Sequence, residues 1–192
     1  MPLHLEKKAI RVLGVAESFR VNEEYSTLAG IIMRSDLIVD GIAIGRLTVS
    51  GNDATRSVIN LFREFRRNDV NAIVISGSVL SLYNVLDISE IFKTLKIPTV
   101  ALSFHKRKSD LRRNVRAKFP SSVARDKLQL LEKLGNSTRF KLNTGYSVFA
   151  RSAGINELDS RKLLDKFTLQ GSVPEPVRVA RLLAKSVSIL NQ

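Results

Sequence analysis

The sequence contains no cysteine and no tryptophan, and only two of its 192 residues are histidine. Without cysteine, the chain forms neither disulfides nor cysteine-ligated zinc sites, and nothing marks an oxidising compartment. His4 and His105 supply no obvious metal-binding pair and no evident base for a Ser-His-Asp triad. The P-loop, G-x-G-x-x-G and G-x-S-x-G patterns are missing as well. These absences exclude the commonest phosphate-binding and serine-hydrolase motifs.

Long hydrophobic runs are also missing. None approaches the ~18 residues that a membrane span needs, and no N-terminal stretch has the pattern of a signal peptide. Hydrophobic residues nevertheless make up 44% of the chain, which suits a sizeable core. We therefore expect a single domain over residues 1–192, soluble and cytoplasmic, with no membrane partner.

Charge is the strongest global signal. Lys and Arg number 31 against 18 Asp and Glu, a net charge of +13, which favours nucleic acid as the partner, although some organisms have basic proteomes throughout. Residues 105–118 alone carry seven Lys or Arg and one Asp. This segment predicts phosphate contacts to nucleic acid, with DNA expected more than RNA, and the alternative is a solvated loop and helix face. The expected contact residues are Lys106, Arg107, Lys108, Arg112 and Arg113.

The order of elements predicts an α/β layer fold with a mixed central sheet. Three β-type runs with short polar breaks indicate an antiparallel meander, and helices and strands then alternate. The meander strands are expected at 11–18, 26–35 and 37–50. Further strands are expected at 72–75 and 97–104, with a last edge strand at 140–150. Helices are expected at 53–68, 88–95, 126–134, 156–169 and 175–190.

The run 72–75 is short, apolar and β-branched, and it ends at Ser76-Gly77-Ser78. Ligand sites in open α/β sheets lie beyond the carboxyl ends of such strands. A serine nucleophile there lacks a base, so a tight turn is the favoured interpretation. A small-molecule nucleotide enzyme that uses this turn is a weaker alternative.

Two acids stand at comparable places, Glu17 at the end of the first strand and Asp53 at the start of the first helix. In a sheet of this order these positions and Ser76 could converge at one end. A two-metal phosphodiesterase needs several carboxylates there, because hard cations about 4 Å apart require oxygen ligands. The alternative role of Asp53 is that of a helix N-cap or first-turn acid.

Several segments together resemble the mostly archaeal endonuclease dU family, which is related to endonuclease V. They are RVLGV at 11–15, GNDAT at 51–55, YNVLDI at 83–88, AGI at 153–155 and SVPEPVRVA at 172–180. The resemblance implies a ribonuclease H-like fold and a metal-dependent endonuclease that acts at deaminated bases. It also implies that Glu17 and Asp53 are the catalytic, metal-binding residues, with Mg²⁺ or Mn²⁺ as the cofactor.

The chain departs from the pattern of that family at several of its acidic positions. Paired aspartates after the first strand are replaced by Ala16 and Glu17, and the Asp-Gly after the central strand is replaced by Ser76-Gly77. Ser50 takes the place of another acid, and Arg181 that of a histidine. These departures favour a second hypothesis, a catalytically silent nucleic-acid-binding protein that needs no metal.

Overall fold

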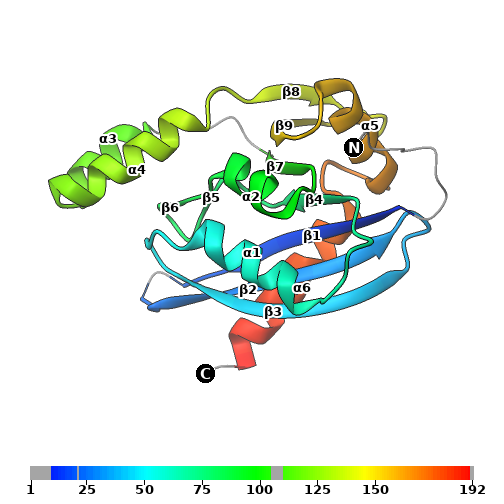
Figure 1. Cartoon of the computed structure of the whole chain (residues 1–192), viewed down its shortest axis with the longest axis horizontal. Coiled ribbons are helices and arrows are strands. Elements are labelled where there is room, and N and C mark those ends of the chain that lie inside the picture. The colour runs from blue at the N-terminus through cyan, green and yellow to red at the C-terminus, as the bar shows by residue number, and fades with distance from the viewer. Residues whose placement is uncertain (1–9, 21, 105–109, 191–192) are drawn as a thin grey trace.

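The structure is a computed structural model that describes residues 10–20, 22–104 and 110–190. Fifteen elements follow one another in this part of the chain (Figure 1). They are β1 (Arg11–Ser18), β2 (Tyr25–Arg34), β3 (Val39–Thr48), α1 (Ala54–Glu64), β4 (Ala72–Ile75), β5 (Val79–Leu80), β6 (Asn84–Val85), α2 (Ile88–Leu95), β7 (Thr99–Ser103), α3 (Leu111–Lys118), α4 (Ser121–Lys133), β8 (Thr138–Lys141), β9 (Ser147–Ala153), α5 (Glu157–Phe167) and α6 (Glu175–Leu190).

Seven strands form one mixed sheet in the order β3-β2-β1-β4-β7-β9-β8, and β5 and β6 form a separate small hairpin. The strands β1, β4 and β7 at its centre run parallel to one another. The other neighbours are antiparallel, so that β1, β2 and β3 form the expected meander. All four residues of β4 are buried, because helices cover both faces of the sheet there.

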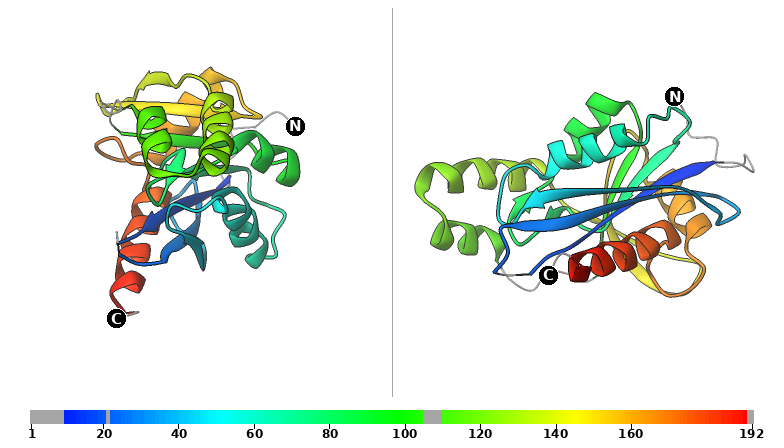
Figure 2. Two further views of the ribbon diagram at one scale, coloured as in Figure 1. Left: turned by 90° about the vertical axis from the view of Figure 1, so that its left-hand side faces the viewer. Right: turned by 90° about the horizontal axis from the view of Figure 1, so that it is seen from below.

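Helices α1 and α2 cover one face of the sheet, and α6 crosses the other (Figure 2). Alternate residues of β1 divide between the two cores, since successive side chains of a strand point to opposite faces. Leu13 and Val15 pack with α1 and α2, whereas Ala16 packs with Ala180 and Ala184 of α6. Hairpin α3–α4 projects beyond one end of the layers (Figure 1).

Close packing of α6 on β1 depends on Gly14. A Cβ atom at this position would lie 2.3 Å from the carbonyl carbon of Pro176, in the first turn of α6. Backbone atoms cannot give way as a flexible side chain can. The glycine therefore determines how near the helix comes to the strand.

The structure confirms the mixed α/β layer fold, and most strands and helices lie where the sequence predicted them. One expectation was wrong in detail, and one helix was missed. The edge strand expected at 140–150 is a hairpin of β8 and β9, and β9 lies inside the sheet between β7 and β8. The basic segment contains a helix, α3, that periodicity did not reveal. Among the described residues, none of the helices combines the length and the apolar character that a membrane span requires.

Candidate functional site

The carboxyl ends of β1 and β4 lie side by side because these strands are parallel neighbours. The backbone N–H of Ser76, just after β4, donates to the carbonyl of Val15 at 2.8 Å. Hairpin β5–β6 and the loop before α1 meet at the same place, where the N–H of Ser50 donates to the carbonyl of Ser81 at 2.8 Å. The candidate site is therefore the end of the sheet that the sequence indicated.

Glu17 leaves β1 toward hairpin β5–β6. Its carboxylate accepts a hydrogen bond from the backbone N–H of Ser81 at 2.6 Å and a second from the Ser81 hydroxyl. Burial raises the pKa of Glu17, against the opposing effect of hydrogen bonds from Ser81 and Ser26. The carboxylate is thus held by protein donors on the face that α1 and α2 cover.

Asp53 immediately precedes α1, but its side chain does not cap the helix. It accepts hydrogen bonds from the hydroxyl of Thr48 at 2.8 Å and from the Asn84 amide at 2.6 Å. The cap comes from Asn84, whose Oδ1 accepts from the N–H of Ala54 at 2.9 Å. Burial alone would raise the pKa of Asp53, but the hydrogen bonds from Asn84 and Thr48 outweigh it and lower the pKa. Asp53 therefore occupies the N-cap position, as the alternative expected, but the side-chain cap itself comes from a residue distant in sequence.

The structure brings Glu17 and Asp53 to the same small hairpin, β5–β6. Glu17 contacts Ser81 there, and Asp53 contacts Asn84. Both carboxylates are already engaged by hydrogen-bond donors. No group of three or more Asp, Glu, His or Cys residues within the described ranges could hold a metal ion. This donor set does not fit a pair of divalent cations, which share several carboxylates.

Ser76 faces helix α6 and not the hairpin. Its hydroxyl accepts hydrogen bonds from Nε of Arg181 at 2.9 Å and from Nη2 of the same guanidinium at 2.7 Å. The guanidinium also lies over the ring of Phe104, 4.4 Å from its centroid. A serine and an arginine therefore occupy the α6 side of the strand ends.

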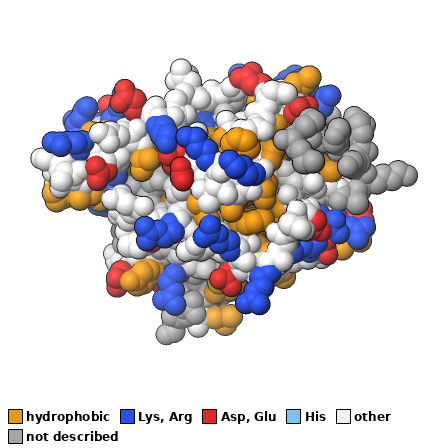
Figure 3. Space-filling model, in the orientation of Figure 1, with side chains coloured by type: hydrophobic (Ala, Val, Ile, Leu, Met, Phe, Trp, Pro, Cys, Tyr) orange, Lys and Arg blue, Asp and Glu red, His pale blue; other side chains and the backbone are white. Residues whose placement is uncertain are grey.

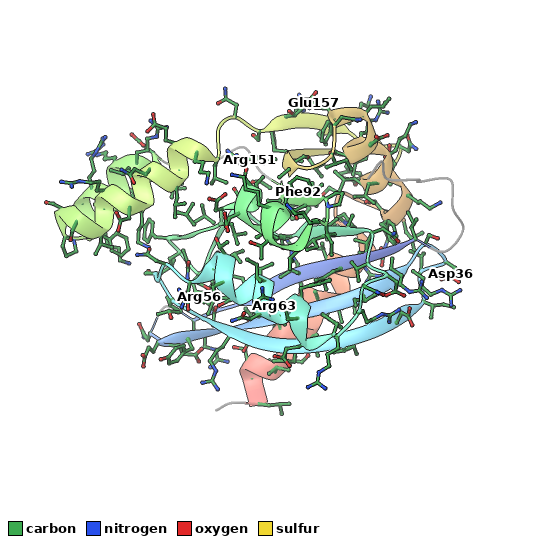
Figure 4. All side chains as sticks on the ribbon, viewed as in Figure 1. Asp36, Arg56, Arg63, Phe92, Arg151 and Glu157 are labelled. Carbon is green, nitrogen blue, oxygen red and sulfur yellow. The ribbon has the colours of Figure 1, made fainter. Side chains whose placement is uncertain are left out.

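A second arginine stands on the opposite face of the turn. Arg151 of β9 donates to the Ser78 hydroxyl and to the Gly135 carbonyl, each at 3.2 Å, and lies beside α2 (Figure 4). Burial lowers the pKa of Arg151 and also that of Arg181. The turn 76–78 is thus flanked by two half-buried arginines. The sequence marked Arg181 only as a departure from the family pattern, and it did not single out Arg151.

Lys127 of α4 is a further residue that the sequence did not single out. Its side chain is 0% exposed, and its Nζ donates to the carbonyl of Gly51 at 2.6 Å, to Oδ1 of Asn52 at 2.6 Å and to the carbonyl of Tyr83 at 3.0 Å. Burial lowers the pKa of Lys127, although the charge of Asp53 opposes the shift. The lysine ties hairpin α3–α4 to the strand-end loops.

Arg112 and Arg113 lie in the first turn of α3, and both are exposed. Asp110 caps this helix, since its Oδ1 accepts from their backbone N–H groups at 3.0 and 3.2 Å. Figure 3 shows Lys and Arg side chains over the projecting hairpin and in a band across the molecule. The other predicted contacts, Lys106, Arg107 and Lys108, lie outside the described residues.

Comparison with known proteins shows the family of this chain. The profile of the family described as Endonuclease dU matches residues 8–188. The chain belongs to the Endonuclease dU family. Among its relatives, the UPF0215 protein of Thermoplasma volcanium is 34% identical, covering 94% of this chain and 91% of the relative. That of Pyrobaculum calidifontis is 30% identical, covering 91% and 95%.

Solved structures show the same fold in this Endonuclease dU protein and in endonuclease V. A protein of unknown function from Archaeoglobus fulgidus superposes with a TM-score of 0.77 at 24% identity, covering 93% of this chain and 98% of the other. Human ENDOV superposes with a TM-score of 0.66 at 13% identity, covering 98% and 88%. Endonuclease V of Ciona intestinalis, in complex with an inosine-containing DNA, gives 0.61 at 11% identity, covering 96% and 88%. The ribonuclease H-like, endonuclease V-like fold is confirmed.

Proposed function

We propose that this protein binds nucleic acid, DNA in preference to RNA, over the ends of the central strands and hairpin α3–α4. We further propose that it binds without two-metal cleavage. The observation that carries the proposal is the donor set at the strand ends, where Arg181 donates to Ser76 while Glu17 and Asp53 already accept from protein groups. Such a set favours an anion over a pair of cations.

Charge and fold support the same function. The net charge of +13 favours a polyanionic partner, and the fold is that of endonuclease V, of which the Ciona protein was crystallised with DNA. The exposed Arg112 and Arg113 extend the positive surface onto α3. Each Lys or Arg that meets a phosphate releases counterions, so affinity should fall steeply with salt.

A salt titration tests this function. Binding of a fluorescein-labelled 24-mer duplex is followed by anisotropy in EDTA between 50 and 300 mM KCl. We expect the slope of log Kd against log[salt] to lessen by about 2 in the double variant Arg112→Ala/Arg113→Ala, since roughly 0.9 counterions are released per phosphate contact. A flat salt dependence, or an unchanged slope in the variant, contradicts the proposal.

The matched control removes two charges elsewhere. Arg161 and Lys162 are exposed on α5, which lies at the opposite end of the molecule from hairpin α3–α4 (Figure 1). We expect Arg161→Ala/Lys162→Ala to leave the slope near that of the unaltered protein. An equal loss in both double variants would mean that net charge alone, and not the α3 surface, governs binding.

A second candidate function is metal-dependent endonuclease activity at deaminated bases, with Glu17 and Asp53 as the residues that hold Mg²⁺ or Mn²⁺. Family membership and the approach of both acids to hairpin β5–β6 favour it. Both acids would have to bind the cation beside the protein donors that they already accept from, and no group of three or more acids in the described ranges assists them. A cytoplasmic location, which the sequence led us to expect, is part of both proposals.

Single-turnover nicking distinguishes the two functions. Duplexes that contain uracil or inosine are incubated with excess protein and Mg²⁺ or Mn²⁺, beside Glu17→Gln and Asp53→Ala variants. Cleavage that both variants abolish establishes the endonuclease. Absence of cleavage together with salt-sensitive binding establishes the binding function. Calorimetric titration with Mn²⁺ gives a readout of the site that does not depend on cleavage.

A further inference from the structure

Arg181 differs from the ion-paired arginines of this protein in what it contacts, and in this it resembles Arg151, whose acceptors are also uncharged. One turn earlier on α6, Arg178 pairs with the carboxylate of Glu175. Arg67 likewise pairs with Asp40 and Asp69. Within the described ranges no carboxylate lies in ion-pair distance of Arg181, whose partners are a hydroxyl and an aromatic ring.

The immediate surroundings of Arg181 offer donors and few acceptors. Its Nε and Nη2 are directed at the single hydroxyl oxygen of Ser76, which leaves the other guanidinium N–H groups without a protein acceptor in the described part of the chain. The hydroxyl hydrogen of Ser76 is a further donor. Phe104 beneath the guanidinium fixes its plane, as stacking on an aromatic ring does.

The place of Arg181 and Ser76 at the end of β4 also favours a ligand site. Ser76 directly follows β4, the central parallel strand, and ligands of such sheets bind beyond these carboxyl ends. A planar guanidinium there matches the oxygens of a phosphate group, which it binds in a bidentate way. A half-buried cation that lacks a counter-charge is costly unless an anion completes it.

We propose that Arg181 and Ser76 form a phosphodiester-binding clamp that takes a backbone phosphate of the nucleic acid directly, without a divalent cation. The inference rests on the proposed binding function and deepens it, because it names the atoms that hold one phosphate. The Arg181 guanidinium N–H groups and the Ser76 hydroxyl donate to the non-bridging oxygens. No covalent bond forms or breaks.

The variant Ser76→Asp tests the clamp most directly. A carboxylate at this position would pair with Arg181 and occupy the guanidinium, while the fold keeps its α6 contact. We expect about tenfold weaker binding of a labelled 20-mer single strand in EDTA, because the occupied guanidinium no longer donates its charge-assisted hydrogen bonds to the phosphate. Thermal stability should be equal or higher. Arg181→Lys keeps the charge but loses the planar guanidinium with its parallel donors, so it should also weaken binding several-fold.

Lys185→Ala is the matched control, because Lys185 is an exposed cation one turn further along α6. We expect its affinity to stay within about twofold of the unaltered protein. Loss of affinity in Ser76→Asp and Arg181→Lys beyond that of Lys185→Ala supports the clamp. Equal affinities in all three variants overturn it, and so does binding at this site that requires Mg²⁺.

Failure of the clamp and failure of the binding function give different results. If the unaltered protein binds DNA and the Ser76 and Arg181 variants bind equally well, only the clamp is wrong. If the protein binds no nucleic acid, the proposed function is wrong, and titration with inorganic phosphate then tests the clamp alone. In an NMR titration, phosphate should shift the Arg181 Nε–H resonance, and Ser76→Asp should abolish this shift. That result supports the clamp, and an unshifted resonance overturns it.

The outer edge of β3 carries a separate, independent feature. This ten-residue strand forms one edge of the sheet, and Ile42 and Ile44 on it are 61% and 43% exposed. A long, apolar edge strand is usually protected, since its free N–H and C=O groups pair readily with another strand. No charged residue interrupts 41–45.

The segment 41–45 reads Gly-Ile-Ala-Ile-Gly in both directions. Antiparallel pairing of two copies about Ala43 therefore places Ile42 opposite Ile44 and glycine opposite glycine. On the other face, Leu61 of α1 meets both Gly30 of β2 and Gly45 of β3, so that α1 lies over the boundary of these strands. With strands about 4.8 Å apart, the two α1 helices would lie about 10 Å apart, an ordinary packing distance.

We infer that β3 is the docking surface for a second copy of this chain, which continues the sheet across a two-fold axis at Ala43. Sedimentation velocity at 5–100 µM tests the inference. We expect a dimer that Ile44→Lys converts to monomer, whereas Leu158→Lys, at an exposed position on α5, leaves it intact. A monomer at every concentration, or a dimer that Ile44→Lys does not weaken, overturns it.

Discussion

Replacing Lys127 by methionine tests how hairpin α3–α4 is held against the strand ends. The substitution keeps a long unbranched side chain beside Phe119, whose ring lies 4.8 Å from Nζ. It removes the donors to the carbonyls of Gly51 and Tyr83. The third acceptor, on Asn52, belongs to an exposed residue and can turn to water.

The expected loss of stability in Lys127→Met follows from the two carbonyl acceptors that lose their donor. Each carbonyl left without a donor costs about 1–3 kcal/mol, and release of a desolvated cation offsets part of the sum. We expect the free energy of unfolding to fall by about 3 kcal/mol. For a chain of this size, Tm should drop by roughly 6–12 °C.

Urea unfolding followed by circular dichroism measures this loss. Arg125→Met is the control, because it makes the same replacement at an exposed position of α4 and should change stability by less than about 0.5 kcal/mol. Hydrogen exchange in α4 should quicken in Lys127→Met only. If Lys127→Met is as stable as Arg125→Met, the lysine gives no net stabilisation and the reasoning is refuted.

Three further substitutions should change stability in a defined direction. Gly14→Ala should cost at least about 3 kcal/mol in urea unfolding, because its Cβ would lie 2.3 Å from the backbone of Pro176. The pKa of Asp53 is lowered in the folded state, so its ionised carboxylate stabilises the fold at pH values above 3.8, the pKa in the unfolded chain. This stabilisation is lost as the pH falls through the lower pKa of the folded state. Asp53→Asn should therefore flatten the fall in stability between about pH 5 and 3, and an unchanged slope would contradict this. The raised pKa of Glu17 has the opposite effect on stability. Ionisation of Glu17 disfavours the folded state as the pH rises from 4.5, the pKa in the unfolded chain, through the higher pKa of the folded state. Glu17→Gln should remove this loss, and Tm compared at pH 5 and 8 checks it.

The sequence by itself determined the layered fold. Apolar alternation and run length are local properties, so the meander and the buried strand β4 could be predicted from them. The ends of β1 and β4 then indicated where a site would lie, and the structure places Glu17 and Asp53 against one hairpin there. Their roles as metal ligands stay a prediction.

Only the tertiary structure decided what these side chains contact. Asn84 caps α1 in place of Asp53, from 30 residues away. Arg181 reaches Ser76 across 105 residues, and Lys127 reaches Gly51 across 76. No local pattern encodes such partners, because they depend on how helices pack on the sheet. The sequence therefore indicated one end of the sheet, and packing determined which side chains meet there.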